Sequence, residues 1–151
     1  MNNYKYLTLL FISFLCVSTH AQEFNLQDTL RGSITPERAG WDLTYYHLDI
    51  EVDLDEQYIS GSNTIQYKVI GPAQRMQVDL QPPLEITEVR QNGKKLKFEK
   101  LGNAHYIDVP DVEMGKVYEV EVSYKGFPKS SRRPPWDGGF KCRKDSKGNH
   151  F

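Results

Sequence analysis

The chain has 151 residues, of which 19 are basic and 20 acidic, giving a formal net charge of −1. This balance argues against a nucleic-acid partner, which would need a strongly basic surface. The length suits one domain that can bury an apolar core of its own.

Residues 1–21 have the pattern of a signal peptide. Lys5 supplies a positive charge, and 7–17 is an apolar run too short to cross a bilayer. Small residues occupy the positions before Gln22 that a signal peptidase reads. We therefore predict cleavage after Ala21 and export to the periplasm or the extracellular space, with no membrane span left in the mature protein.

Two other interpretations of residues 1–21 have less support from the sequence. A retained membrane anchor would need a longer apolar run and a positive flank after it. A lipoprotein site at Cys16 would need small residues before it, whereas Phe14 and Leu15 are bulky. Cys142 is then the single cysteine of the mature chain, so stability must come from an apolar core rather than from an internal disulfide.

Alternation with a period of two begins at Trp41. The preceding residues 22–40 are polar and contain glycine and proline, so they are predicted to form an extended N-terminal arm, and no helix is predicted in the mature chain. In the first strand one face is apolar and is predicted to be buried. Its members are Tyr46, Leu48, Ile50, Val52 and Leu54. The opposite, polar face carries His47, Asp49, Glu51 and Asp53.

Further short strands follow, separated by turn signals. Gly61 falls on the inward face of the second strand, which indicates a bulge or a close backbone approach. The apolar pattern slips by one between Ile86 and Val89, which again indicates a bulge. Asn92-Gly93 is a strong two-residue hairpin signal. Seven or eight such strands predict an all-β fold, an antiparallel β-sandwich.

The predicted organisation has four parts. The signal peptide (1–21) and the N-terminal arm (22–40) precede a β-sandwich domain at 41–128. Residues 129–151 read as a loop and an incomplete hairpin that would lead to an absent catalytic domain. Because a domain rarely stops at the start of a strand, we expect the chain to be a fragment of a longer protein.

No catalytic, metal-ligating or substrate-binding residue is predicted in this chain, and no cofactor. His47, His105 and His150 are widely spaced and lie in no metal-binding motif. The acidic residues of the first strand recur at every second position, as expected for the solvent-facing side of a strand, and they need no catalytic explanation. A basic group near the end is more typical of a solvated hairpin than of a phosphate site. It comprises Lys141, Arg143, Lys144 and Lys147.

The two tryptophans leave a second class of function open. Trp41 and Trp136 would serve as carbohydrate platforms in a stand-alone secreted β-sandwich that binds carbohydrate or protein. Tryptophans that anchor a core or a loop are the more common case. A complete binding module would also be expected to close its last hairpin.

Several segments, in this order and spacing, resemble the N-terminal domain of the aminopeptidase N family of zinc metallopeptidases. They are 41–53 (WDLTYYHLDIEVD), 59–61 (ISG), 78–80 (VDL), 84–89 (LEITEV), 92–93 (NG), 120–128 (VEVSYKGFP) and 136–149. The resemblance covers 41–151.

The resemblance implies a saddle-shaped β-sandwich that packs on a thermolysin-like catalytic domain. In the family the zinc ligands, the catalytic glutamate and the substrate loop lie in that second domain. The resemblance therefore implies a non-catalytic fragment whose partner is the absent intramolecular catalytic domain, with zinc and peptide substrates belonging to the full enzyme.

Overall fold

The structure is a computed structural model that describes residues 24–72, 74–134 and 136–151. The predicted signal peptide, its cleavage point after Ala21 and Cys16 lie outside the described residues. Within the described ranges, no helix is both long and apolar enough to span a membrane.

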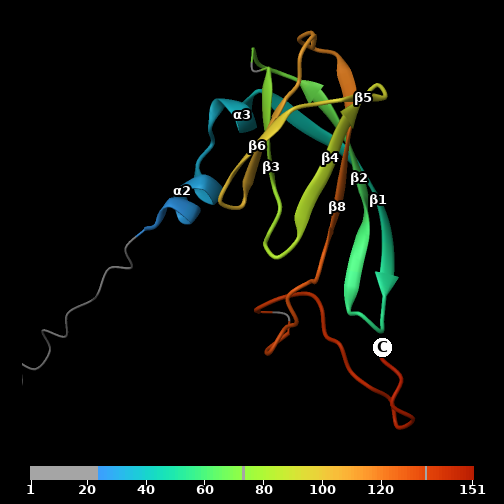
Figure 1. Ribbon diagram of the computed structural model, residues 1–151. Coiled ribbons are helices and arrows are strands. Elements are labelled where there is room, and N and C mark those ends of the chain that lie inside the picture. Colours follow the sequence, from blue (N-terminus) through green and yellow to red (C-terminus); the bar gives the residue numbers. More distant parts are fainter. Residues whose placement is uncertain (1–23, 73, 135) are drawn as a thin grey trace, which may run out of the picture.

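The chain folds as an antiparallel β-sandwich, which confirms the predicted fold class (Figure 1). The larger sheet has the strand order β1-β2-β8-β4-β5, and the smaller has the order β3-β7-β6. The strands of the larger sheet are β1 (Trp41–Asp53), β2 (Tyr58–Val69), β8 (Val117–Gly126), β4 (Glu85–Gln91) and β5 (Lys94–Lys95). Those of the smaller sheet are β3 (Arg75–Asp79), β7 (Ala104–Asp108) and β6 (Phe98–Leu101).

The core lies between the two sheets. Alternate residues of β2, β8 and β4 meet the smaller sheet and lose contact with water, as period-two alternation requires. The buried cluster comprises Ile65, Tyr67, Val69, Met76, Ile86, Val89, Ile107, Val109, Val120 and Val122. The sandwich therefore has the apolar core expected of a domain without an internal disulfide.

The predicted irregularities in the strands are largely confirmed. The ladder between β4 and β8 shifts register between Ile86 and Glu88, as the slipped pattern predicts. Asn92 and Gly93 both have positive φ, 51° and 75°, and connect β4 to β5. At Gly61 the register with β1 is continuous, so the glycine serves a close backbone approach and not a bulge.

The expectation of an extended arm without helix is wrong at two places. Helix α2 spans Leu26–Gly32, and helix α3 spans Pro36–Ala39. Asn25 caps α2, because its side chain accepts hydrogen bonds from the backbone N–H groups of Gln27 and Asp28. Helices this short are marginal in isolation, so contacts with the sandwich decide their formation.

Those contacts converge on the carbonyl group of Leu30 in α2. The Arg38 guanidinium donates to it at 3.1 Å, and the Gln77 side-chain amide donates to it at 3.0 Å. Arg38 also forms an ion pair with Asp79 at the end of β3. The sequence pattern missed α2 and α3 because they depend on groups far away along the chain.

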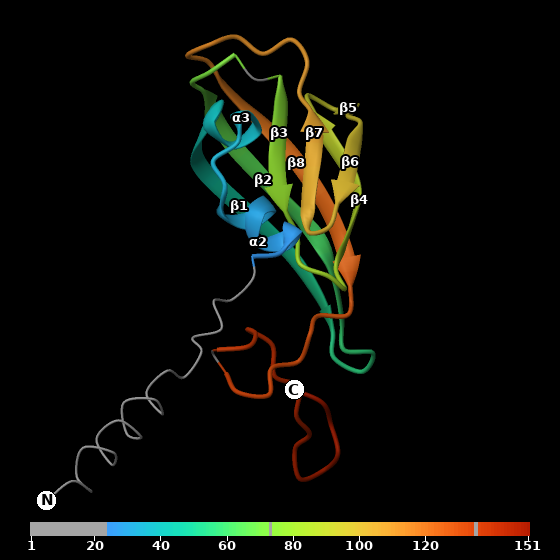
Figure 2. The same cartoon turned by 90° about the vertical axis from the view of Figure 1, so that its left-hand side faces the viewer.

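The last segment, 129–151, lies beyond the strand ends, at the end of the sandwich where β1 turns into β2 (Figures 1 and 2). Asp137 organises its first part by accepting hydrogen bonds from the Ser131 hydroxyl and from the backbone N–H groups of Arg132 and Arg133. Further on, Arg143 and Phe151 exchange two backbone hydrogen bonds of 3.0 and 2.9 Å. Residues 143–151 therefore turn back on themselves, with an antiparallel bridge between Lys144 and His150.

Candidate functional site

The strongest surface feature of the described chain is an uncovered apolar strip on β1. We call the side chains of Tyr46, Leu48, Ile50, Val52 and Leu54 the apolar flank. Leu48, Ile50 and Val52 are 58%, 47% and 53% exposed. The prediction that these side chains are buried is therefore wrong, although their common face is predicted correctly.

The cause is a mismatch between the two sheets. Val52 pairs with Ile59 and Tyr46 with Ile65, so the apolar flank lies on the core-facing side of the larger sheet. The smaller sheet has only three strands of four or five residues, and it covers β2, β8 and β4 rather than β1. The apolar flank thus lies on the same side of the larger sheet as the core, but no strand of the smaller sheet packs over it in the described structure.

A hollow of about 250 Å³ lies between the apolar flank and the edge of the smaller sheet. Its lining is mostly aliphatic and comes from both sheets, with Phe140 of the last segment added at one side. The lining residues are Leu48, Ile50, Ile59, Asn63, Ile65, Val78, Asp79, Leu80, Leu84, Ile86, Val122, Tyr124 and Phe140. Such a concave apolar surface binds apolar side chains or ligands.

A few polar groups border this hollow. The Asn63 side-chain oxygen is buried and has no hydrogen-bond partner among the described residues. Burial, followed by the nearby Asp79 carboxylate, raises the pKa of Tyr46. Burial, followed by Asp49, raises the pKa of Tyr124. Both phenols therefore stay neutral at physiological pH. Tyr124 and Asn63 line the hollow, which can therefore offer a hydroxyl group and an amide oxygen to an occupant, whereas Tyr46 lies on the flank outside the lining.

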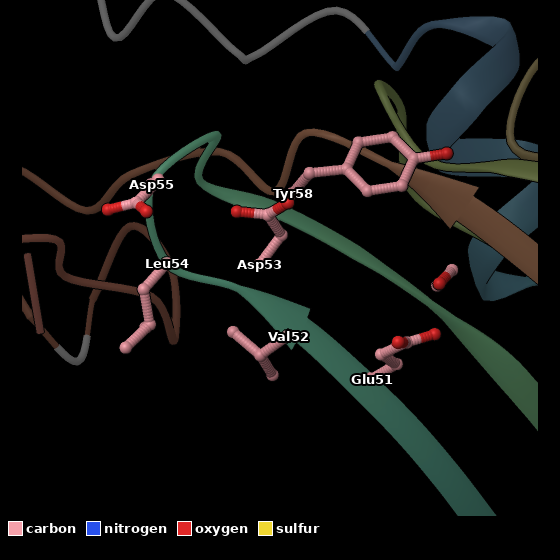
Figure 3. A pocket seen from close by; sticks show the side chains of 7 residues that line it. Glu51, Val52, Asp53, Leu54, Asp55 and Tyr58 are labelled. Atoms are coloured by element: carbon pink, nitrogen blue, oxygen red, sulfur yellow. The ribbon is translucent and has the colours of Figure 1, made fainter.

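A second, more open hollow lies at the turn between β1 and β2 (Figure 3). Its lining combines carboxylates and hydroxyls with two aliphatic side chains: Glu51, Val52, Asp53, Leu54, Asp55, Tyr58 and Ser60. In the part of the chain that the structure describes, no group of three or more His, Cys, Asp or Glu side chains is placed to hold a metal ion.

The histidines are held apart on separate elements. His47 is exposed on β1, and His150 lies near Gln57, with 3.5 Å between its Nδ1 and the Gln57 side-chain nitrogen. His105 is fully buried in β7, and its Nδ1 has no partner among the described residues. Burial, followed by the charge of Lys100, lowers the pKa of His105, so it remains neutral in the core.

The two tryptophans have different environments. Trp41 packs edge-on against Tyr67, with ring centroids 6.2 Å apart, and its indole N–H donates to the Glu37 carbonyl at 2.7 Å. It therefore anchors α3 to the core and is no free platform. Trp136 is 87% exposed in the last segment. Cys142, in the same segment, is a half-buried free thiol.

Comparison with protein-family models and with curated protein sequences finds no match. Among solved structures, a mutant of the M1 zinc metallopeptidase from Deinococcus radiodurans bound to a Tyr-Ser-Ala substrate superposes with a TM-score of 0.58 at 21% identity. The match covers 70% of this chain and 25% of that one. Native yeast LTA4 hydrolase superposes with a TM-score of 0.53 at 19% identity, over 62% of this chain and 16% of that one.

These likenesses define the fold as the β-sandwich that is part of M1 zinc metallopeptidases. The resemblance expected from the sequence is thus confirmed at the level of the fold. The chain spans about a quarter of the length of the metallopeptidase structure.

Proposed function

We propose that this chain is the non-catalytic N-terminal domain of an exported zinc aminopeptidase, an enzyme that removes N-terminal residues from peptides. The observation that carries the proposal is the shared fold with M1 zinc metallopeptidases, one of them bound to the peptide Tyr-Ser-Ala. In this proposal the β-sandwich comprises 41–128, and 129–151 lead to the catalytic domain.

The residues that the structure describes do not fit a zinc site. Zinc in peptidases is held by three protein ligands close together in space, whereas the described histidines lie on separate elements. In the proposed enzyme, zinc would therefore belong to the catalytic domain, where it would activate a water molecule for attack on the peptide bond. This chain would contribute to activity indirectly, through a surface that packs against the catalytic domain.

The apolar flank is the surface that fits this role. A row of half-exposed aliphatic side chains beside a hollow of about 250 Å³ is typical of a face that another protein surface covers. Phe140 lies at the border of the hollow, so the segment that would lead to the catalytic domain already contacts it. We propose that the catalytic domain packs on this flank and completes the core.

Export is proposed from the leader sequence. The mature protein would begin at Gln22 and act in the periplasm or outside the cell. The mass of the exported protein tests this point, because retention of residues 1–21 would contradict it.

The activity is tested by comparing this chain with the product of the reading frame extended beyond Phe151. The extended protein should bind about one equivalent of zinc and hydrolyse a leucine anilide. The 151-residue chain should show neither property. In this chain His47→Ala and His105→Ala should leave any background hydrolysis unchanged. Zinc binding with turnover by the short chain alone, or an extension without peptidase activity, would overturn the proposal.

The exposure of Trp136 favours a second candidate, a binding module for carbohydrate or protein. A glycan that binds the chain and is lost on Trp136→Ala, with no dependence on residues beyond Phe151, would support it. Trp41 gives this candidate no support, because its ring is engaged with Tyr67 and Glu37.

A further inference from the structure

The backbone edge of β1 is the basis of an inference that goes beyond the proposed enzyme. β1 is 13 residues long and stands at the end of the five-stranded order. Its register with β2 is continuous over 45–53, with one shift between Leu43 and Tyr45. In a β-strand, alternate N–H and C=O groups point away from a single partner strand. In the described structure, the backbone of 45–53 forms hydrogen bonds with β2 alone.

The formal charges on this edge are all acidic, so they protect it against strand addition only by partners that are not basic. Natural edge strands carry charged side chains, especially lysine, or proline or bulges, or they are very short or covered. The stretch 45–53 contains no lysine, proline or glycine and no register shift. It therefore presents a long, regular row of free hydrogen-bonding groups.

The side chains beside this edge define the chemistry of a partner. Asp49, Glu51 and Asp53 form the row on the solvent-facing side of β1. Their cross-strand neighbours on β2 are uncharged: Ser62, Ser60 and Tyr58. None of the three carboxylates takes part in an ion pair among the described residues. Opposite charges on neighbouring strands are favourable, so an added strand with basic residues at these positions would be stabilised.

The core-facing side of β1 determines which residues are favoured at the remaining, alternate positions of the added strand. Leu48, Ile50 and Val52 point toward the core side and are half-exposed. Apolar residues of an added strand would lie beside this row, on the same side of the sheet, and would leave the face of the flank open to the catalytic domain. The repeat expected of the partner is therefore basic, apolar, basic, apolar.

We propose that the free edge of β1 docks an extended segment of another protein chain in which Lys or Arg alternates with apolar residues. The segment adds a strand next to β1 over 45–53. Pairing of two copies of β1 is disfavoured, because it would bring two acidic rows onto the same face of one sheet.

The test uses the full chain and synthetic peptides in which Lys and Val alternate. A peptide of the same composition with Lys and Val in separate blocks is the control for non-specific attraction. The alternating peptide should bind more tightly than the block peptide, as measured by fluorescence anisotropy. On binding, every second backbone amide of 45–53 should gain protection from hydrogen exchange.

Charge reversal provides the matched variants. D49K/E51K/D53K should weaken binding of the alternating Lys–Val peptide on the order of tenfold, because three favourable cross-strand charge pairs become repulsive. It should also gain affinity for an alternating Glu–Val peptide. E85K/E121K reverses charge on the inner strands β4 and β8 of the same sheet and should leave binding unchanged. The single variant Glu51→Lys serves if the triple variant fails to fold.

Three results would overturn the proposal. One is equal binding of the block and alternating peptides, and another is protection that appears outside β1. The third is a dimer of the free chain that D49K/E51K/D53K dissociates, which would assign the edge to a second copy. None of these readouts depends on zinc or peptidase activity, so this proposal and the proposed enzyme can fail separately.

Discussion

Gly61 shows how one missing side chain permits the ladder between β1 and β2. A Cβ atom at this position would lie 2.0 Å from the Asp49 carbonyl oxygen, far inside van der Waals contact. That oxygen belongs to the backbone of the neighbouring strand and cannot rotate away. The sequence placed a glycine on an inward face, and the structure supplies the reason.

Gly61→Ala should therefore destabilise the chain by roughly 1–3 kcal/mol, the usual cost of forcing extra volume into a packed site. The midpoint of urea unfolding measures this change. Gly139→Ala is the control, since no described atom outside its chain neighbours lies within 4 Å of the added Cβ. Equal midpoints for the two variants would contradict the proposed clash.

Tyr67 is a second residue whose environment makes a testable difference. Its hydroxyl donates a 2.8 Å hydrogen bond to the Gln91 side-chain oxygen inside the core. Burial, followed by the neighbouring Tyr118, raises the pKa of Tyr67 to about 12. A raised pKa means that the folded protein holds the proton at pH values where the unfolded chain has lost it.

Tyr67→Phe should lower the free energy of unfolding at neutral pH by roughly 1–2 kcal/mol, because Gln91 loses a buried partner. The stabilisation from the neutral phenol is fully present below pH about 10 and is lost as the pH rises toward about 12. The variant should therefore lose less stability than the parent over that range in urea titrations. Tyr45→Phe, which removes the hydroxyl of an exposed side chain, is the control, and an unchanged alkaline decline in Tyr67→Phe would contradict this account.

At the scale of elements, α2 and α3 depend on side chains of the sandwich. The Leu30 carbonyl accepts hydrogen bonds from Arg38 and from Gln77, and the Asn103 backbone N–H donates to the Gln27 side chain at 3.0 Å. These bonds join three parts of the chain that lie far apart in sequence. The helices form because they are docked, and not because of their intrinsic propensity.

Arg38→Ala should loosen this docking without unfolding the sandwich. We expect backbone amides of 26–39 to exchange on the order of tenfold faster, since the variant loses an ion pair and a hydrogen bond worth about 1 kcal/mol. Amides of β8 should keep their protection. Arg31→Ala is the matched control, because no hydrogen bond or ion pair of the Arg31 side chain is present in the described structure. Faster exchange throughout β8 in Arg38→Ala would instead indicate that the helices stabilise the whole domain.

For the whole molecule, the main feature is a sandwich with unequal layers. The larger sheet carries more apolar surface than the three short strands of the smaller sheet cover, and the apolar flank of β1 is what remains exposed. Such an exposed apolar surface promotes aggregation of a free domain, and it serves as an interface in a domain that packs against a partner.

Replacing Leu48 and Ile50 by Ser should raise the solubility of this chain and lower its binding of a hydrophobic dye. The change in unfolding free energy should be small for an exposed site, within about 1 kcal/mol. Val89→Ser, in the buried core, should instead cost more than about 2 kcal/mol. In a protein extended beyond Phe151, the same Leu48 and Ile50 substitutions should reduce stability. Equal effects in the short and extended proteins would contradict the proposal that a following domain covers the flank.

The sequence by itself determined most of the strands and turns and, for β1, β2 and β8, the side that faces inward. These depend on alternation and on residues such as Gly93, whose backbone preferences are local. Only the tertiary structure decided whether an inward side is covered, because cover depends on the length and number of strands in the opposite sheet. For the same reason the exposure of Leu48 and Ile50, the docking of α2 and the free edge of β1 were not predictable from the sequence. Each of them is a relation between segments distant in the chain, which no local pattern encodes.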